Sequence, residues 1–166
     1  MKLTTKELII FSMLGTIMYV SKIIMELAPN IHLLAVLTIT FTVVYRKKAL
    51  YPIYIFVFLQ GLFSGFSLWW IPNLYTWLVL WCVTMLLPPK LQMKHQAIIY
   101  MILASLHGFL YGVLYAPAQM ILFNYNFTQI IAWIIAGLPF DIIHGISNFF
   151  CGLLIVPLIN TLKKLS

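Results

Sequence analysis

Long runs of apolar residues, separated by short polar or proline-containing links, form the main pattern of this chain. A helix needs about 20 apolar residues to cross the hydrocarbon core of a bilayer, with a range of about 17–25. Several stretches approach this length and are predicted to be transmembrane helices. Their ranges are 6–28, 31–45, 49–66, 73–88, 96–116 and 139–162. The pattern therefore predicts an all-α membrane protein with six transmembrane helices, in a single integral membrane domain over residues 1–166.

Composition supports a membrane protein and argues against a soluble domain. The 166 residues are 63% hydrophobic and 8% charged, whereas about 25% of the residues in a typical soluble domain are charged. A chain this short has too much surface for its volume to hide so many apolar side chains from water. We therefore expect the chain to lie in the cell membrane and to cross it several times.

Basic residues fall at the ends of the predicted helices and indicate the topology. The formal net charge is +7, and all but one of the Lys and Arg residues lie on one side of the six-helix arrangement. The positive-inside rule assigns that side to the cytoplasm. These residues are Lys2, Lys6, Arg46, Lys47, Lys48, Lys90, Lys94, Lys163 and Lys164. Both termini are therefore expected in the cytoplasm, and the positive charge does not require a nucleic-acid partner.

One further apolar segment, residues 117–137, does not fit an even number of transmembrane helices. Counting it as a span would place Lys163 and Lys164 outside the cell, against the positive-inside rule. Polar residues interrupt its apolar pattern at Asn124, Asn126 and Gln129. We therefore expect a partly helical external segment that folds like a lid onto or into the outer mouth of the bundle.

The last predicted helix carries an acidic residue, an imidazole and an amide. Asp141, His144 and Asn148 have helical spacing and share one face. Ionisable groups within a membrane are costly and usually face the bundle interior or a cavity. With Pro139 in the first turn, Asp141 is predicted near the helix N-terminus, where the helix dipole favours its charge. Two interpretations stay open: Asp141 caps its own helix and bonds His144, or the three residues form one wall of a pocket.

Aromatic and polar side chains elsewhere are predicted to face the same pocket. They are His107, Tyr111 and Tyr115 on the fifth helix, Asn73 and Trp77 on the fourth, and Trp70 in the link before it. The residues on each helix are spaced by four and therefore share a face. Aromatic packing around a hydrogen-bonded histidine, or anchoring of tryptophans at the membrane interface, is the structural alternative.

The sequence gives no strong signal for catalysis or for a metal. Cys82 and Cys151 are not part of a CxxC motif and have no histidine at ligand spacing. The chain contains no P-loop or glycine-rich phosphate cradle. We therefore expect no enzyme activity, no metal and no cofactor. The alternative is acid–base chemistry by Asp141 and His144 in a small intramembrane enzyme.

The first predicted helix and the turn after it carry candidate gating residues. Lys22 and Glu26 are four residues apart, which is typical of an exposed ion pair on one helix. Asn30 and His32 follow in the short turn, where they are well placed to gate a pocket that opens outward.

Small residues on the same helix suggest a contact with another helix. Ser12 and Thr16 are one turn apart, with Gly15 beside them. Small residues at this spacing let a second helix backbone approach closely. The second helix could belong to this bundle or to a partner protein, and both interpretations stay open.

Taken together, the chain resembles the substrate-binding S component of an energy-coupling factor (ECF) vitamin transporter. The resemblance covers essentially the whole chain, and its most specific part is AGLPFDIIHGISNFF at 136–150; KELIIFSMLGTIMYV at 6–20 and WWIPNLYTW at 69–77 add to it. In that family a small membrane protein captures a micronutrient near the extracellular face. The loop after its first helix acts as a gate, and a transmembrane coupling protein with two ATPases supplies the energy. The first helix of the family often carries Ala-xxx-Ala, which packs on the coupling protein, and Ser12 and Thr16 occupy those positions here.

The predicted function is therefore high-affinity capture of a small water-soluble vitamin or precursor for import. The pocket candidates are aromatic and mostly neutral, which suits a neutral or weakly basic heteroaromatic ring. The resemblance points to hydroxymethylpyrimidine or pyridoxine, while pantothenate, cobalamin and a queuosine precursor remain open. A stand-alone permease, in which Asp141 and His144 relay protons, is the alternative mechanism.

Overall fold

The computed structural model describes residues 3–28, 30–88 and 93–165, and all regular structure in these ranges is helical. The all-α prediction is therefore confirmed. The helices are α1 (Thr5–Met25), α2 (Leu34–Tyr45), α3 (Leu50–Ser64), α4 (Asn73–Leu86), α5 (Met93–Phe109), α6 (Tyr111–Phe123), α7 (Phe127–Cys151) and α8 (Ile155–Leu165), with the short 3₁₀ helices η1 (Arg46–Ala49), η2 (Leu68–Trp70) and η3 (Gly152–Leu154). Of the basic residues used for topology, Lys2 and Lys90 lie outside the described residues, as does the side chain of Lys94.

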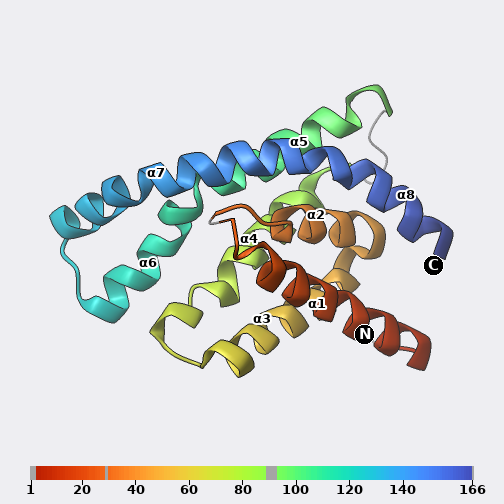
Figure 1. The fold of residues 1–166 in the computed structure, drawn as a ribbon, viewed down its shortest axis with the longest axis horizontal. Coiled ribbons are helices and arrows are strands. Elements are labelled where there is room, and N and C mark those ends of the chain that lie inside the picture. Colours follow the sequence, from red (N-terminus) through yellow and green to blue (C-terminus); the bar gives the residue numbers. More distant parts are fainter. Residues whose placement is uncertain (1–2, 29, 89–92, 166) are drawn as a thin grey trace.

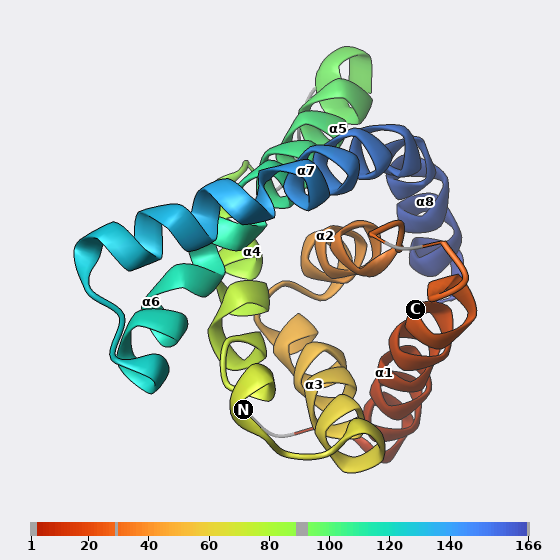
Figure 2. The same cartoon turned by 60° about the vertical axis from the view of Figure 1, so that its left-hand side comes forward.

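The centre of the bundle is α2. Figure 2 shows it enclosed by α1, α3, α4, α5, α7 and α8. Every residue from Leu34 to Thr42 is buried, which explains why the sequence of this helix is apolar on all sides and not amphipathic. The Thr42 hydroxyl donates to the Thr38 carbonyl of the preceding turn, at 2.6 Å. The buried Thr42 hydroxyl is thereby satisfied by a backbone carbonyl of its own helix.

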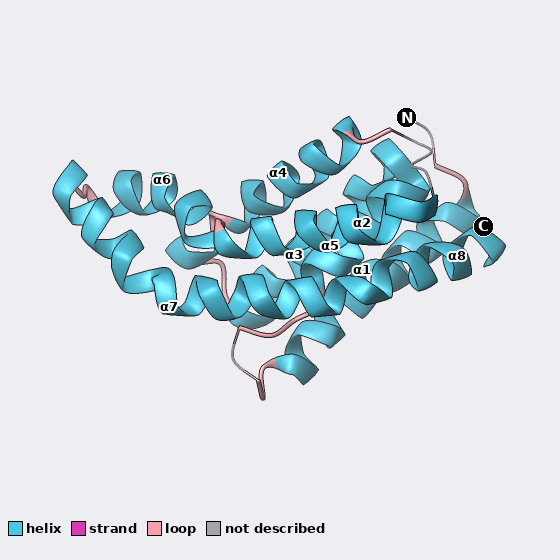
Figure 3. Ribbon diagram, turned by 90° about the horizontal axis from the view of Figure 1, so that it is seen from above, coloured by secondary structure: helices cyan, strands magenta, loops and turns pink. Residues whose placement is uncertain are grey.

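Two long helices, α5 and α7, lie side by side along the top of the molecule in Figure 1 and pack closely. The chain leaves α5 at Leu110, runs out through α6 and returns through the first part of α7. We call α6 together with residues 127–137 of α7 the arm. It projects away from the rest of the bundle in Figure 1 and Figure 3. Both described ends of the chain lie at the opposite end of the molecule, and which side faces the cytoplasm stays a prediction.

Three helical stretches among the described residues are long and apolar enough to cross a membrane, namely Thr5–Met25, His95–Phe123 and Phe127–Leu165. This agrees with the prediction of a membrane protein. The second, third and fourth predicted spans correspond to α2, α3 and α4, which have 12, 15 and 14 residues. These helices are shorter than the roughly 20 residues needed to cross the hydrocarbon core. The count of six membrane-spanning helices therefore stays a prediction.

The predicted start of the last helix, at residue 139, is wrong because α7 begins at Phe127. Asn124 ends α6 in the left-handed conformation, with φ 54°. Asn126 then begins α7 with a capping box, in which its side chain and that of Gln129 each accept from the other residue's backbone N–H. The three polar residues that suggested an interrupted segment thus build the turn between two helices.

The segment predicted to form a lid, residues 117–137, is helical on both sides of that turn. Pro117 lies inside α6 and Pro139 inside α7. Each proline removes one backbone donor from its helix, but neither ends the helix that contains it. The segment therefore forms most of a helical hairpin. Its position outside the membrane stays a prediction.

Basic side chains join three elements at the end of the bundle opposite the arm. Lys48 of η1 forms an ion pair with Glu7 of α1. Arg46 donates to the Met85 carbonyl in the last turn of α4, at 3.0 Å. A cation at a helix C-terminus is favoured by the helix dipole and pairs a carbonyl that has no partner within its own helix. Two members of the predicted cytoplasmic cluster therefore have structural contacts.

Candidate functional site

A close crossing between α5–α6 and α7 positions the candidate site. A Cβ added to Gly108 would lie 2.8 Å from the Gly145 backbone, and one added to Gly112 would lie 2.4 Å from Asp141 Oδ2. Gly108 and Gly112 form a G-x-x-x-G motif, a spacing that lets helix backbones meet. The sequence shows this motif, but it was not part of the prediction.

Polar groups bridge the same crossing. Ser105 Oγ donates to the Gly145 carbonyl at 2.9 Å, and Asn148 Nδ2 donates to the Ala104 carbonyl at 3.3 Å. Hydrogen bonds of this kind between helices are typical of packed helices in membranes. Asn148, predicted as a ligand contact, therefore uses its amide nitrogen to hold α7 against α5. Its Oδ1 is buried and has no hydrogen-bond partner among the described residues.

Asp141 caps α6 and not its own helix. Its carboxylate accepts from the Gly112 N–H, with N–O distances of 3.2 and 3.1 Å, and Gly112 lies in the first turn of α6. The predicted place near the N-terminus of the last helix is wrong because α7 starts about four turns earlier. The helix-dipole argument applies instead to the neighbouring helix. The described residues include no hydrogen bond between Asp141 and His144, so the interpretation in which Asp141 caps its own helix and bonds His144 is wrong.

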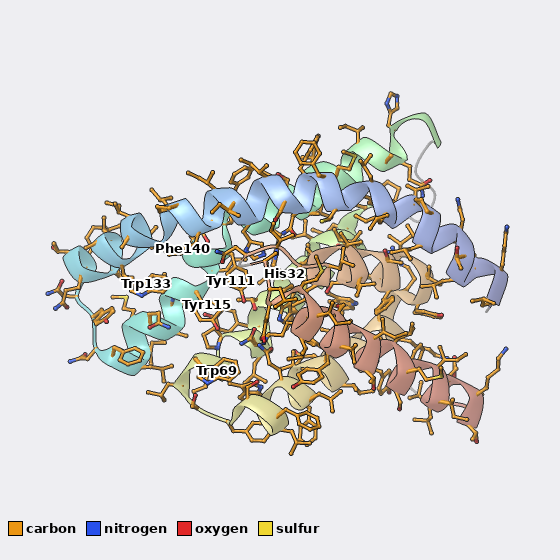
Figure 4. All side chains as sticks on the ribbon, in the orientation of Figure 1. His32, Trp69, Tyr111, Tyr115, Trp133 and Phe140 are labelled. Atoms are coloured by element: carbon orange, nitrogen blue, oxygen red, sulfur yellow. The ribbon has the colours of Figure 1, made fainter. Side chains whose placement is uncertain are left out.

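Six rings from separate parts of the chain meet beside this crossing, and we call them the ring cluster. They are His32 before α2, Trp77 of α4, His107 of α5, Tyr111 and Tyr115 of α6, and His144 of α7. The centroids of His32 and His144 are 4.3 Å apart, and Tyr111 lies 5.0 Å from His144. Figure 4 shows His32, Tyr111 and Tyr115 in one band below α7. The predicted stripe on the fifth helix does contact the predicted face of the last.

A hydrogen-bond chain joins α6 to the start of α4 at one side of the ring cluster. The Tyr115 hydroxyl donates to the Trp69 carbonyl at 2.6 Å, and Asn73 Nδ2 lies 3.3 Å from the same hydroxyl. Asn73 Oδ1 in turn accepts from Trp77 Nε1 at 3.3 Å. Asn73, Trp77 and Tyr115 were predicted to share a pocket, and the structure brings them together.

Trp70 does not join this group. Its Nε1 donates to the Val57 carbonyl of α3 at 2.8 Å, and its ring packs edge-on against Phe66 at 5.0 Å. The backbone carbonyl of its neighbour Trp69, in contrast, accepts the hydrogen bond from Tyr115 of the cluster. The prediction placed Trp70 in the pocket, whereas its indole contacts α3 and Phe66, because the direction of each side chain in the short helix η2 does not follow from helical spacing.

Several buried polar atoms around the ring cluster have no hydrogen-bond partner among the described residues. They are His32 Nδ1, Thr76 Oγ1, His107 Nδ1, His144 Nε2 and Asn148 Oδ1. Each buried donor or acceptor left unpaired costs about 1–3 kcal/mol. A ligand that offers matching donors and acceptors would remove part of this cost.

Thr76 was not predicted as a site residue. Its carbonyl lies 3.2 Å from His107 Nε2, and its side chain is buried. A signal was present in the sequence, because Thr76 follows Asn73 by nearly one helical turn and precedes Trp77. A polar residue at this position shares the face of its two predicted neighbours.

The connection between α1 and α2 covers one side of the ring cluster. Asn30 has a left-handed backbone, with φ 64°, and its carbonyl accepts from Ser147 Oγ of α7 at 3.2 Å. A cavity of about 150 Å³ adjoins His32 and is lined in part by Lys22, Glu26 and Asn30. Lys22 and Glu26 form the predicted ion pair. The gating role of Asn30 and His32 stays a prediction.

The small residues of α1 do not form one surface. Gly15 is buried, and a Cβ there would lie 2.5 Å from the Ile55 side chain of α3. Ser12 and Thr16 are exposed on the outward face, where the Thr16 hydroxyl donates to the Ser12 carbonyl at 2.9 Å. Gly15 therefore packs the bundle, and a docking role remains a prediction for Ser12 and Thr16.

Comparison with protein families, curated proteins and solved structures finds no match to this chain. Among the described residues, no group of three or more His, Cys, Asp or Glu side chains is arranged to hold a metal ion. The function therefore has to be argued from the ring cluster and from the residues around it.

Proposed function

We propose that this chain is the substrate-capture subunit, or S component, of an ECF-type transporter. In this proposal it binds a small water-soluble vitamin or precursor within the membrane, and a coupling protein with two ATPases supplies the energy for import. The observation that carries the binding part is the ring cluster with its unpaired buried polar atoms. Concave sites with aromatic walls and a few fixed polar groups are typical of small-molecule binding.

The chemistry of the cluster favours a neutral or weakly basic ring as ligand. Trp77 and Tyr111 offer aromatic surfaces for stacking or edge contacts. Imidazole, amide and hydroxyl groups offer donors and acceptors without a fixed charge. Asp141, the acid at the crossing of α5–α6 with α7, is engaged with the Gly112 N–H. Hydroxymethylpyrimidine and pyridoxine are therefore the first ligands to test.

Entry of the ligand would go through the connection between α1 and α2. Residue His32 contacts His144 in the cluster, and Asn30 is tied to Ser147 by one hydrogen bond. Release of that bond would let His32 move away from His144 and Trp77 and open space beside these two rings. The connection would thus act as a gate that its own histidine closes.

Ligand identification is the first test of the binding part. Mass spectrometry of the small molecules released from the denatured protein should detect a heteroaromatic compound, and calorimetry should then give its affinity. We expect His144→Ala to weaken binding at least tenfold. The matched control is His95→Ala, because His95 is exposed near the start of α5. Equal affinity in both variants would remove the ring cluster from the binding site.

The energy-coupling part rests on the resemblance of the sequence and has its own test. The pair Ser12→Trp and Thr16→Trp should reduce co-purification with the coupling protein and two ATPases while leaving ligand affinity unchanged. Ile121→Trp is the control, because Ile121 is 80% exposed on the arm. Uptake that survives ATP depletion but collapses with a protonophore would favour the stand-alone permease.

A further inference from the structure

A long groove runs along α3 on the side away from the ring cluster. Its volume is about 580 Å³, and Lys47 lines it together with Leu50, Tyr51, Tyr54, Ile55, Phe58 and Leu59. These positions follow one another at helical spacing and therefore form one stripe. From residue 47 to residue 59 the stripe is about 18 Å long, at about 1.5 Å per residue. Its lining is apolar except for the lysine at one end and two phenol hydroxyls.

Contacts to both neighbouring helices hold the walls of this groove in place. On one side, the Tyr54 hydroxyl donates to the Leu74 carbonyl of α4 at 2.9 Å. On the other side, the Tyr51 ring stacks on Phe11 of α1, with centroids 5.9 Å apart and an interplanar angle of 1°. Phe58, farther along the stripe, is 55% exposed. The groove is therefore a fixed outward-facing feature between α1 and α4.

The lysine at the end of the groove differs in its contacts from the basic residues beside it in the sequence. Arg46 donates to a carbonyl of α4, and Lys48 pairs with Glu7. Lys47 is exposed, and no ion pair joins it among the described residues. An unpaired ammonium group thus stands at one end of an apolar groove, in a chain whose longest helices can cross a membrane.

We propose that this groove binds one acyl chain of an anionic phospholipid, with the lipid phosphate held by Lys47. The length of the stripe, about 18 Å, is close to the hydrocarbon thickness of one leaflet, which is half of about 30 Å. Lysine side chains at a membrane surface attract anionic headgroups. The apolar stripe supplies the contact for the chain, and the ammonium supplies the preference for the headgroup. This site is separate from the ring cluster and does not depend on the transported ligand.

Native mass spectrometry of the detergent-purified chain tests the proposal. Phosphatidylglycerol and phosphatidylcholine with identical acyl chains are added in equal amounts. The wild-type chain should retain phosphatidylglycerol in preference, and Lys47→Gln should reduce that preference about fivefold. The matched control is Lys164→Gln, because Lys164 is an exposed basic residue in the last turn of α8; it should leave the preference unchanged.

A second variant separates the chain contact from the headgroup contact. Phe58→Ala should weaken binding of both lipids by a similar factor, about threefold, and should leave their ratio unchanged. Equal binding of the two lipids to the wild type, or an unchanged preference in Lys47→Gln, would overturn the proposal. A dimer in the same spectra that excludes both lipids and is lost in Phe58→Ala would assign the groove to a second copy of the chain.

Discussion

The two halves of α7 belong to one apolar helix but have different surroundings. The inner half, residues 138–151, buries Asp141, His144, Gly145 and Asn148. The outer half, residues 127–137, buries Ile130. Lipid chains and a protein interior are both apolar, so apolar residues do not distinguish the two environments. Small and polar residues therefore mark the covered side of such a helix.

The glycines in each half show the same difference. A Cβ added to Gly145 would lie 2.5 Å from the Phe109 ring, whereas a Cβ added to Gly137 would meet no atom within 4 Å. Gly145 is therefore required by a close approach, and Gly137 is not. Gly145 lets the inner half pack closely against α5, whereas Gly137 in the outer half makes no such packing contact.

The largest effect is expected from a substitution on α5 that widens its crossing with the inner half of α7. Gly108→Ala places a methyl group against the backbone of α7, which cannot move aside as a side chain can. We expect a loss of about 3 kcal/mol in the free energy of unfolding. The control, Gly137→Ala, should stabilise the helix by up to about 1 kcal/mol, because alanine has the higher helix propensity. Unfolding in mixed micelles with increasing SDS measures both, and similar values for the two variants would contradict the comparison.

The next effect concerns the cap that the inner half supplies to α6. Asp141→Ala removes the acceptor for the Gly112 N–H and should cost about 2 kcal/mol. Asp141→Asn keeps one acceptor oxygen and loses the charge, so its cost should be about half as large. Hydrogen exchange at the Gly112 amide should accelerate in the order wild type, Asn, Ala. An unchanged exchange rate in Asp141→Ala would show that the cap does not hold the start of α6.

The outer half has a cap of its own, which should matter less. Asn126→Ala removes the side-chain acceptor for the Gln129 N–H at the exposed tip of the arm. We expect a cost of about 1 kcal/mol and faster hydrogen exchange confined to the first turn of α7. Ligand affinity, measured by calorimetry, should stay the same. A loss of affinity would show that the arm is coupled to the ring cluster more tightly than its contacts indicate.

The smallest effect is expected at the ion pair near the gate. Lys22→Gln leaves Glu26 without its partner, but Glu26 is 55% exposed on its side chain. Exposed ion pairs four residues apart contribute about 0.3–0.5 kcal/mol and are screened by salt. At low salt the variant should therefore unfold slightly more easily than the wild type. At high salt the two should have nearly equal free energies of unfolding. A larger loss would assign this pair a role in holding the connection between α1 and α2.

Features that depend on helical spacing could be predicted from the sequence. The all-α class follows from the length of the apolar runs. The contact between Tyr111 and Tyr115 and the pairing of Lys22 with Glu26 follow from residues four apart on one helix. The start of α7 was also a local feature, because Asn126 and Gln129 have the spacing of a capping box. It was missed because Asn126 and Gln129 were interpreted as interruptions of an apolar segment, and Pro139 as part of the first turn of the last helix.

Other parts of the site depend on how separate helices align. The bond between Asp141 and the Gly112 N–H follows from the register of α6 against α7, and spacing along one helix does not contain that register. The place of His32 against His144 likewise depends on how the connection before α2 folds back. The members of the ring cluster could therefore be identified from the sequence, whereas Gly112, the partner of Asp141, could not.

The helical stretch from Phe127 to Leu165 has 39 residues and is therefore about 58 Å long. This is about twice the hydrocarbon thickness of a bilayer, near 30 Å. The stretch is bent at η3, where α8 turns away from the line of α7 (Figure 1), so its two ends lie closer together than this length. α7 alone, with 25 residues, is about 38 Å long, so hydrophobic mismatch would act on the exposed Phe127 and Ile131 at its outer end if the helix crosses the bilayer. A thicker bilayer would cover more of the arm, so membrane thickness would change how it is held against the bundle.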